Sequence, residues 1–96
     1  MSESAYVIEF SATAEQAWLR FSEDEREELT PWLRKLRQHP VPGERSGVIR
    51  LRGLTADGRP LFYSQTERFG IYHSINEHRV AVLTIIARPN LDIPQA

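Results

Sequence analysis

The sequence contains no cysteine, and this absence excludes both a disulfide framework and a thiolate metal site. It also has no long hydrophobic run: its longest apolar stretch, residues 80–87, is far shorter than the roughly 18 residues of a membrane span. The N-terminal residues lack the basic and apolar segments of a secretory signal. We therefore expect a cytoplasmic protein that folds by packing alone and makes no contact with the membrane.

Lysine is nearly absent, because eleven of the twelve basic residues are arginine. Two explanations stay open: arginine suits bidentate phosphate recognition, and genome composition produces the same bias. The net charge of −1 hides an uneven distribution along the chain. Residues 1–33 carry eight acids and two bases, whereas residues 34–59 carry seven bases and two acids. The basic character is therefore concentrated in the middle of the sequence.

Histidine is also scarce, and its three residues do not fall at the spacing of a metal site with nearby carboxylates. We therefore predict no metal site. His73 lies in a strand-like segment with the parity of the expected core, where desolvation favours the neutral imidazole. We expect His73 to be structural rather than catalytic.

The length of 96 residues fits one domain, because a chain of this size buries only about 60 to 65 % of its unfolded surface. Apolar residues make up 41% and charged residues 26%, a balance that excludes compositional disorder. Residues 40–43 form a stretch dense in proline and glycine, which indicates a loop within the domain. We predict a single domain over residues 1–96, with residues 89–96 forming an extended or mobile tail.

The first half of the chain has helical patterns after one strand. Residues 6–10 are β-branched and aromatic, which favours a strand, and apolar residues at helical spacing then predict a short helix. A capping box from Ser22 to Glu25 starts a second helix, which Pro40 ends. Pro31 either kinks this helix or divides it in two, and we favour one kinked helix.

The second half of the chain follows the two-residue period of strands. Four strands are predicted, and the links between them are too short for anything but antiparallel neighbours. They cover residues 48–52, 61–66, 69–76 and 79–87. The expected fold is therefore α+β with the order βααββββ, in which an antiparallel sheet carries a helical hairpin on one face.

This order and the local sequence resemble the RelE/ParE superfamily of bacterial toxins. The resemblance covers residues 6–88 and rests on short segments that follow one another in the family's order. They are residues 6–11 with Ala14, a helical hairpin ending in Leu36 and Pro40, residues 51–54, the strand residues Phe69, Ile71 and Ile75, residues 80–83, and Arg88.

The resemblance implies the toxin of a type II toxin–antitoxin system, neutralised by a cognate antitoxin. Members of the family either cleave messenger RNA on the ribosome or, in the ParE branch, poison DNA gyrase. RNA cleavage in the family relies on arginine side chains and the ribose 2′-hydroxyl, so the resemblance implies no cofactor.

The sequence departs from the family where the chemistry lies. Phe69 and Gly70 stand where the family has an aromatic residue and an arginine, so the arginine that handles the scissile phosphate is absent. The preceding strand carries Leu61, Tyr63 and Gln65 in place of lysines. Whether the chain is an enzyme therefore stays open.

The candidate catalytic residues of an RNA-cleaving form are Arg59, Tyr63 and Arg88. Arg88 matches a functional position of the family if a gap of one or two residues is allowed. Tyr63 has the chemistry of a general acid, and Arg59 is the last residue of the basic segment.

The candidate nucleic-acid-binding residues are Arg50, Arg52, Arg68, Tyr72 and Arg79. Strand alternation predicts that Leu51 faces the helices, so that both flanking arginines rise about 7 Å apart from the open face of the sheet. That spacing suits phosphates on a single strand. The alternatives are that these arginines are solvated and that the two tyrosines pack as a cross-strand pair.

Three functional hypotheses follow. The first is a RelE-type toxin with RNA cleavage, and the second is a non-enzymatic module, either a gyrase-directed toxin or an inactivated relative that binds its antitoxin. The third is an unrelated small domain that binds a ligand on its sheet.

Overall fold

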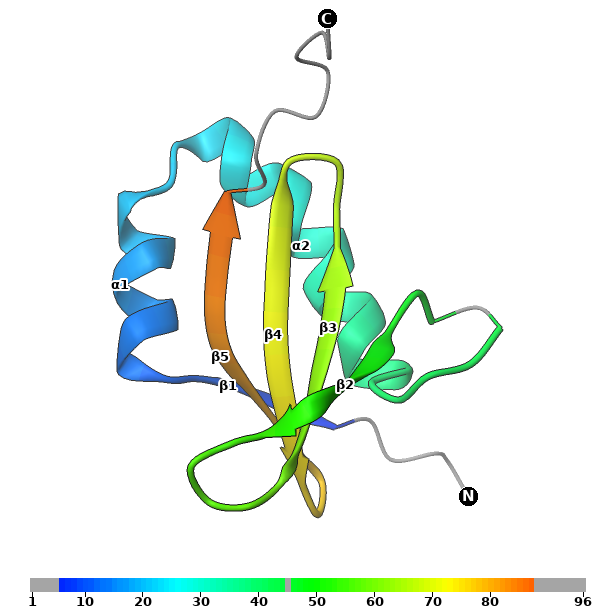
Figure 1. Ribbon diagram of the computed structural model, residues 1–96. Coiled ribbons are helices and arrows are strands. Elements are labelled where there is room, and N and C mark those ends of the chain that lie inside the picture. Colours follow the sequence, from blue (N-terminus) through cyan, green and yellow to red (C-terminus); the bar gives the residue numbers. More distant parts are fainter. Residues whose placement is uncertain (1–5, 45, 88–96) are drawn as a thin grey trace, which may run out of the picture.

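The computed structural model describes residues 6–44 and 46–87, which form two helices and one five-stranded sheet (Figure 1). The order of elements is the predicted βααββββ. Strand β1 (Val7–Phe10) precedes helices α1 (Ala12–Arg20) and α2 (Glu23–Gln38), and four strands follow, β2 (Ile49–Leu54), β3 (Pro60–Gln65), β4 (Phe69–Asn76) and β5 (Arg79–Ala87). Neither described helix is long and apolar enough to cross a membrane. The predicted tail, residues 89–96, lies outside the described residues.

Both helices begin where the sequence supplies a cap. The side chain of Ser11 accepts a hydrogen bond from the backbone N–H of Ala14 at the start of α1. The capping box of α2 is complete, because Ser22 and Glu25 each accept a hydrogen bond from the other's backbone. Pro31 lies inside α2, so the prediction of one helix through this proline is confirmed.

The sheet has the strand order β1-β5-β4-β3-β2. Strands β2 to β5 form the predicted antiparallel meander, whereas β1 pairs parallel to β5, with Val7 beside Arg79. The sheet is therefore mixed rather than wholly antiparallel as predicted. The reason is the crossover: the chain passes through both helices and the meander before its last strand returns beside the first in the same direction.

The core lies between the helices and one face of the sheet. Its buried residues come from both helices, from the residue just before β2, and from β3, β4 and β5: Ala14, Leu29, Leu36, Val48, Phe62, Phe69, Ile71, Val82 and Ile85. Trp18 and Trp32 are only half-buried at its margin. Trp32 is nevertheless fixed, because its indole N–H donates to Ser64 Oγ at 3.1 Å.

Candidate functional site

Two tyrosines pair across neighbouring strands on the face of the sheet opposite the core, here called the open face. Tyr63 in β3 lies opposite Tyr72 in β4, and their ring centroids are 4.9 Å apart with the planes tilted by 55°. The hydroxyl of Tyr63 donates to Gln65 Oε1 at 3.1 Å. The pair has the geometry of a cross-strand packing contact.

The ring of Tyr63 also covers Gly70. A Cβ atom added to Gly70 would lie 2.7 Å from the Tyr63 hydroxyl and 2.9 Å from Cε1. Real Cβ contacts are essentially never this short, so a side chain at position 70 requires Tyr63 to move. The family that the sequence resembles has an arginine at this position. Here the phenol ring of Tyr63, from the neighbouring strand, fills the space beside Gly70.

The prediction that Arg50 and Arg52 share the open face with the tyrosines is wrong. Ile49 is the residue of β2 opposite Tyr63, and Arg50 is opposite Phe62, a core residue. Directly opposed residues of an antiparallel pair point to the same face. Arg50 therefore belongs to the helix-facing side. A register shift lies between Arg50 and Leu54, so strand alternation does not by itself place Arg52.

The physical reason is the position of Val48, whose side chain is buried in the core just before β2 begins. Residues two positions apart share a face, so Arg50 follows Val48 on the helix side. The side chain remains exposed because β2 is an edge strand. Gly53 confirms the parity, since a Cβ there would contact Leu61 of the open face at 3.8 Å.

Arg68 is held by a carboxylate from α2. Its Nε donates to Glu28 Oε1 at 2.6 Å, and its backbone N–H donates to Glu28 Oε2 at 3.1 Å. The hydroxyl of Thr66 donates to the same Oε2 at 2.6 Å. Glu28 thus ties α2 to the turn between β3 and β4, and this nucleic-acid candidate contributes to a structural contact.

The ionisation of Glu28 follows from these contacts. Partial burial of the carboxylate opposes its charge, but the hydrogen bonds from Thr66 and Arg68 outweigh that cost and lower the pKa of Glu28. The ionised form therefore stabilises the turn at neutral pH.

We expect Glu28→Ala to lower the free energy of unfolding by about 1.5 to 3 kcal/mol at pH 7, because hydrogen bonds to the charged acceptor are lost. The carboxylate contributes above the pKa of the unfolded chain, and its contribution is lost as the pH falls through the lowered pKa of the native state. Denaturant unfolding at pH 7 and pH 3 measures this difference. Arg68→Ala is the control, since the exposed guanidinium adds little while Thr66 and the backbone still bind Glu28. Equal losses for both variants would contradict this assignment.

The other candidates are spread over the molecule. Arg79, at the start of β5, donates through Nη1 to Glu9 Oε2 at 3.2 Å, and Arg59 in the turn before β3 lies 3.9 Å from Asp57. Arg59 and Tyr63 are separated by about 13 Å of strand at the usual rise per residue. Arg88 lies outside the described residues. Within the described residues, the hydrogen bond of Tyr63 goes to Gln65 and the ion pair of Arg59 goes to Asp57.

His73 occupies the core position that its parity predicts. The imidazole is 0% exposed, stacks on Phe62 and places Nε2 2.8 Å from the carbonyl oxygen of Pro40. A carbonyl only accepts, so Nε2 carries the proton and Nδ1 is the deprotonated nitrogen. Nδ1 is buried without a hydrogen-bond partner among the described residues. Burial lowers the pKa of His73, although the bond to Pro40 partly opposes this effect.

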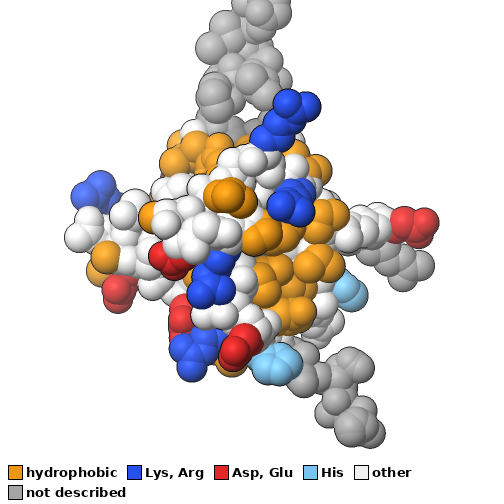
Figure 2. Space-filling view, turned by 60° about the horizontal axis from the view of Figure 1, so that its bottom comes forward, with side chains coloured by type: hydrophobic (Ala, Val, Ile, Leu, Met, Phe, Trp, Pro, Cys, Tyr) orange, Lys and Arg blue, Asp and Glu red, His pale blue; other side chains and the backbone are white. Residues whose placement is uncertain are grey.

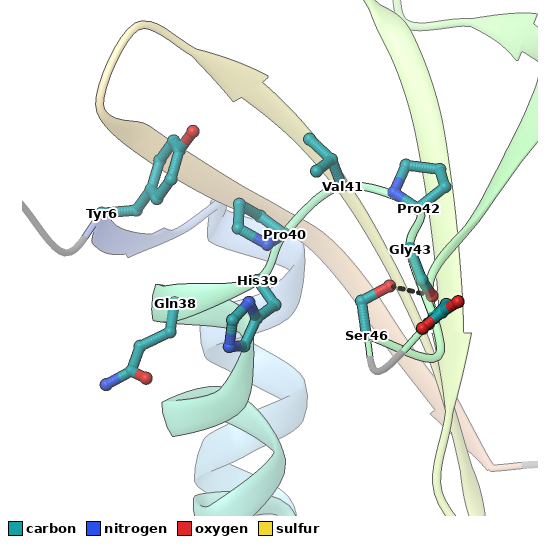
Figure 3. A pocket seen from close by; sticks show the side chains of 9 residues that line it. Tyr6, Gln38, His39, Pro40, Val41, Pro42, Gly43 and Ser46 are labelled. Carbon is teal, nitrogen blue, oxygen red and sulfur yellow. Dashed lines mark hydrogen bonds between the residues drawn. The ribbon is translucent and has the colours of Figure 1, made fainter. Parts of the chain in front are cut away.

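A pocket of about 430 Å³ lies on the other side of the Pro40 loop (Figure 3). It is lined by Tyr6, the end of α2 and residues 40–44 and 46. Ser46 fixes the loop by donating to the carbonyl of Gly43 at 3.3 Å. The proline- and glycine-dense sequence predicts the loop but not the pocket, because Tyr6 is brought to the pocket by a hydrogen bond from its backbone N–H to the carbonyl of Arg37.

No group of three or more histidine, aspartate or glutamate residues within 6–44 and 46–87 has the geometry to hold a metal ion.

Solved structures with the same fold come from three organisms. One is a chain of the archaeal RelE–RelB complex of Pyrococcus horikoshii OT3, with a TM-score of 0.70 and 18% identity over 90% of this chain and 98% of that chain. A chain of the toxin–antitoxin complex RelBE2 of Mycobacterium tuberculosis has a TM-score of 0.69 and 15% identity, covering 88% and 99% of the two chains. A chain of the intact Escherichia coli RelBE complex has a TM-score of 0.52 and 21% identity, covering 90% and 100%.

No protein-family model matches the sequence, and no curated protein is similar to it in sequence. The likeness to these structures therefore shows the fold, which is that of the RelE toxin structures.

Proposed function

We propose that this protein is the toxin component of a type II toxin–antitoxin system and that a cognate antitoxin neutralises it. The observation that carries the proposal is the shared fold, which extends over nearly the whole of this chain and of chains from RelBE complexes. The order of elements agrees with it, as do the short sequence segments that resemble the RelE/ParE superfamily.

RNA cleavage on the ribosome is the first candidate mechanism. Arg59, Tyr63 and Arg88 would carry it, with arginine stabilising the charge of the phosphorane-like transition state and the ribose 2′-hydroxyl attacking. Tyr63 is the chemically apt residue among the described positions, but its hydroxyl is engaged with Gln65 and its ring covers Gly70.

A non-enzymatic mechanism, inhibition of DNA gyrase or antitoxin binding alone, is the second candidate. The absence of an arginine at position 70 favours it, because in the family that the sequence resembles this arginine handles the scissile phosphate, whereas here Tyr63 packs over Gly70.

Controlled expression in a bacterial host distinguishes these mechanisms. A toxin arrests growth, and co-expression of the antitoxin restores it. RNA cleavage produces new 5′ ends in primer-extension mapping, whereas gyrase inhibition produces a loss of supercoiling activity in vitro. If Tyr63 is a general acid, Tyr63→Phe abolishes the new 5′ ends while the thermal stability stays close to that of the wild type.

Growth arrest that persists unchanged in Tyr63→Phe, without new RNA ends, supports the non-enzymatic mechanism. Arg20→Ala, at the exposed end of α1, is the matched surface control. Normal growth and unaltered RNA at full expression of the wild-type chain would contradict its assignment as a toxin.

A further inference from the structure

The pocket at the end of α2 has no part in the proposed function. Its volume of about 430 Å³ suits a ligand of the size of one or two amino-acid side chains, and its described lining is Tyr6 with residues 38–44 and 46. None of the described candidate residues for RNA cleavage or nucleic-acid binding belongs to this lining. Figure 2 turns this end of the molecule forward and shows hydrophobic side chains gathered next to histidine side chains.

The loop that forms one wall of the pocket is fixed to the core. Pro40 is fully buried, and its carbonyl lies 2.8 Å from Nε2 of the buried His73. Ser46 is also buried, and both its backbone N–H and its hydroxyl donate to the carbonyl of Gly43 at 3.3 Å. The pocket is therefore formed before any ligand binds, which lowers the entropic cost of binding.

The loop is poor in hydrogen-bond donors. In a continuing helix, residues 40 and 42 would donate to the carbonyls of Leu36 and Gln38, but both are proline and have no N–H. The C-terminal end of a helix also carries a partial negative charge. The end of α2 beside the pocket therefore offers acceptors to a ligand rather than donors.

Glu44 adds a full negative charge. It is the only charged residue of the described lining when histidine is counted as neutral. Within residues 6–44 and 46–87, no lysine, arginine or histidine nitrogen lies within 4.0 Å of its carboxylate. An exposed carboxylate without an ion-pair partner can accept two hydrogen bonds from one guanidinium group.

The two ends of the pocket differ in chemistry. Figure 3 shows Tyr6 on one side of Pro40 and Val41, and Ser46 on the other side. Glu44 lies inside the turn that the bonds between Ser46 and Gly43 close. An aromatic ring therefore marks one end and a carboxylate marks the other, with an apolar surface of proline and valine between them.

We propose that this pocket binds an arginine side chain of a partner polypeptide together with the apolar residue next to it. The guanidinium pairs with Glu44, its methylene stem packs on Val41 and the prolines, and the apolar neighbour contacts the ring of Tyr6. Arginine suits this site better than lysine because its planar fork binds both carboxylate oxygens. Free arginine suits it less, because the carboxylate of the amino acid would lie among acceptors and Glu44.

This inference does not rest on the assignment of the chain as a toxin, because it uses only the geometry and charge of the pocket. Its test measures binding and needs neither growth arrest nor an antitoxin. Normal growth on expression would contradict the proposed function and leave the pocket proposal intact.

The experiment titrates the full chain, labelled with ¹⁵N, with N-acetyl-leucyl-arginine amide and follows the backbone amide signals by NMR. We expect saturable shifts at Tyr6 and residues 38–44, with a Kd of about 1 mM that rises as salt is added. The matched ligand replaces arginine by citrulline, which has nearly the same shape but no charge. It is expected to bind about three- to fivefold more weakly, as the loss of an exposed ion pair implies. Equal affinity of the two ligands, or shifts elsewhere on the molecule, would overturn the proposal.

Two variants separate the ends of the pocket. Glu44→Gln is expected to remove the preference for arginine over citrulline, whereas Glu27→Gln, with the same change of charge on the exposed side of α2, retains it. Tyr6→Ala is expected to remove the advantage, about fivefold, of the leucyl over the glycyl ligand, and Tyr6→Phe retains it because the ring remains. Unchanged preferences in both Glu44→Gln and Tyr6→Ala would place the ligand at another site.

Two results would assign the pocket to a different ligand and so overturn the proposal. Tighter binding of agmatine than of the dipeptide would indicate a small-molecule cation. Shifts of the same signals by inorganic phosphate, abolished in Arg45→Ala, would indicate an anion held by Arg45, which lies outside the described residues.

Discussion

Gly70→Ala is expected to destabilise the protein by about 1 to 3 kcal/mol, the usual cost of adding a methyl group to a filled site. The new Cβ would lie 2.7 Å from the Tyr63 hydroxyl, so the ring must leave its position over β4. For a domain of this size such a loss lowers the melting temperature by about 4 to 8 °C per kcal/mol. Thermal and denaturant unfolding measure it.

The double-mutant cycle with Tyr63→Ala identifies the cause. Without the phenol, Gly70→Ala is expected to change sign and stabilise the chain by up to about 1 kcal/mol, because alanine restricts the unfolded chain more than glycine does. Gly53→Ala is the control, since its Cβ would meet Leu61 at an ordinary 3.8 Å. A cost that persists in the Tyr63→Ala background would show that position 70 needs glycine for its backbone rather than for the contact with Tyr63.

Acidification from pH 7 to pH 5 is expected to destabilise the protein through His73 by up to about 2 kcal/mol, the limit that an unfolded pKa near 6.5 sets. The native pKa of His73 lies below the unfolded one because the imidazole is buried. The stability that the neutral imidazole contributes is therefore complete above the pKa of the unfolded chain. It is lost as the pH falls below that value toward the pKa of the native state. Chemical denaturation at half-unit steps of pH measures this slope.

His73→Phe is the matched variant, because a ring remains stacked on Phe62 but no proton can bind. We expect His73→Phe to lower the free energy of unfolding by about 1 to 3 kcal/mol at every pH, because the carbonyl of Pro40 loses its hydrogen bond. We also expect the free energy of unfolding to change less between pH 5 and pH 7. His78→Gln, in the exposed turn before β5, is expected to retain the wild-type slope. A wild-type slope in His73→Phe would assign the pH dependence to another group.

The elements were largely predictable because their signals are local. The capping box placed the start of α2, and the change from helical to two-residue period placed the last four strands close to their observed bounds. The direction of β1 was not predictable in this way. It depends on which sheet edge remains open after the meander has formed, and no local residue encodes that choice.

The orientation of β2 was predicted wrongly because alternation alone does not identify the core side of an edge strand. Arg50, Leu51 and Arg52 suggested an apolar residue facing the helices between two exposed ones. In the structure Val48 occupies the core position and Ile49 lies opposite Tyr63, so the apolar residue on the open face is Ile49, and Arg50 lies on the helix side. The sequence did contain a signal for the observed orientation, because Ile49 and Leu51 alternate as apolar residues on a strand face that is not buried.

Two further features depend on contacts between strands. The register shift after Tyr72 leaves no residue of β4 opposite Leu83 in β5. Val82 and Ile85 therefore both reach the core although they are three residues apart. The absence of an arginine at position 70 was visible in the sequence, but the contact at this position was not, because it is made by the ring of Tyr63 from the neighbouring strand.

The parallel pairing of β1 with β5 also governs the order in which the protein folds. Val7 and Arg79 are neighbours in the sheet but 72 residues apart along the chain, so their contact carries a large loop-closure cost. Hairpins β3–β4 and β4–β5 close over a few residues and form early by comparison. During synthesis the first strand to emerge must wait for the last one. Until β1 pairs with β5, the outer backbone edge of β5 is exposed, and the nascent chain can pair there with strands of other molecules.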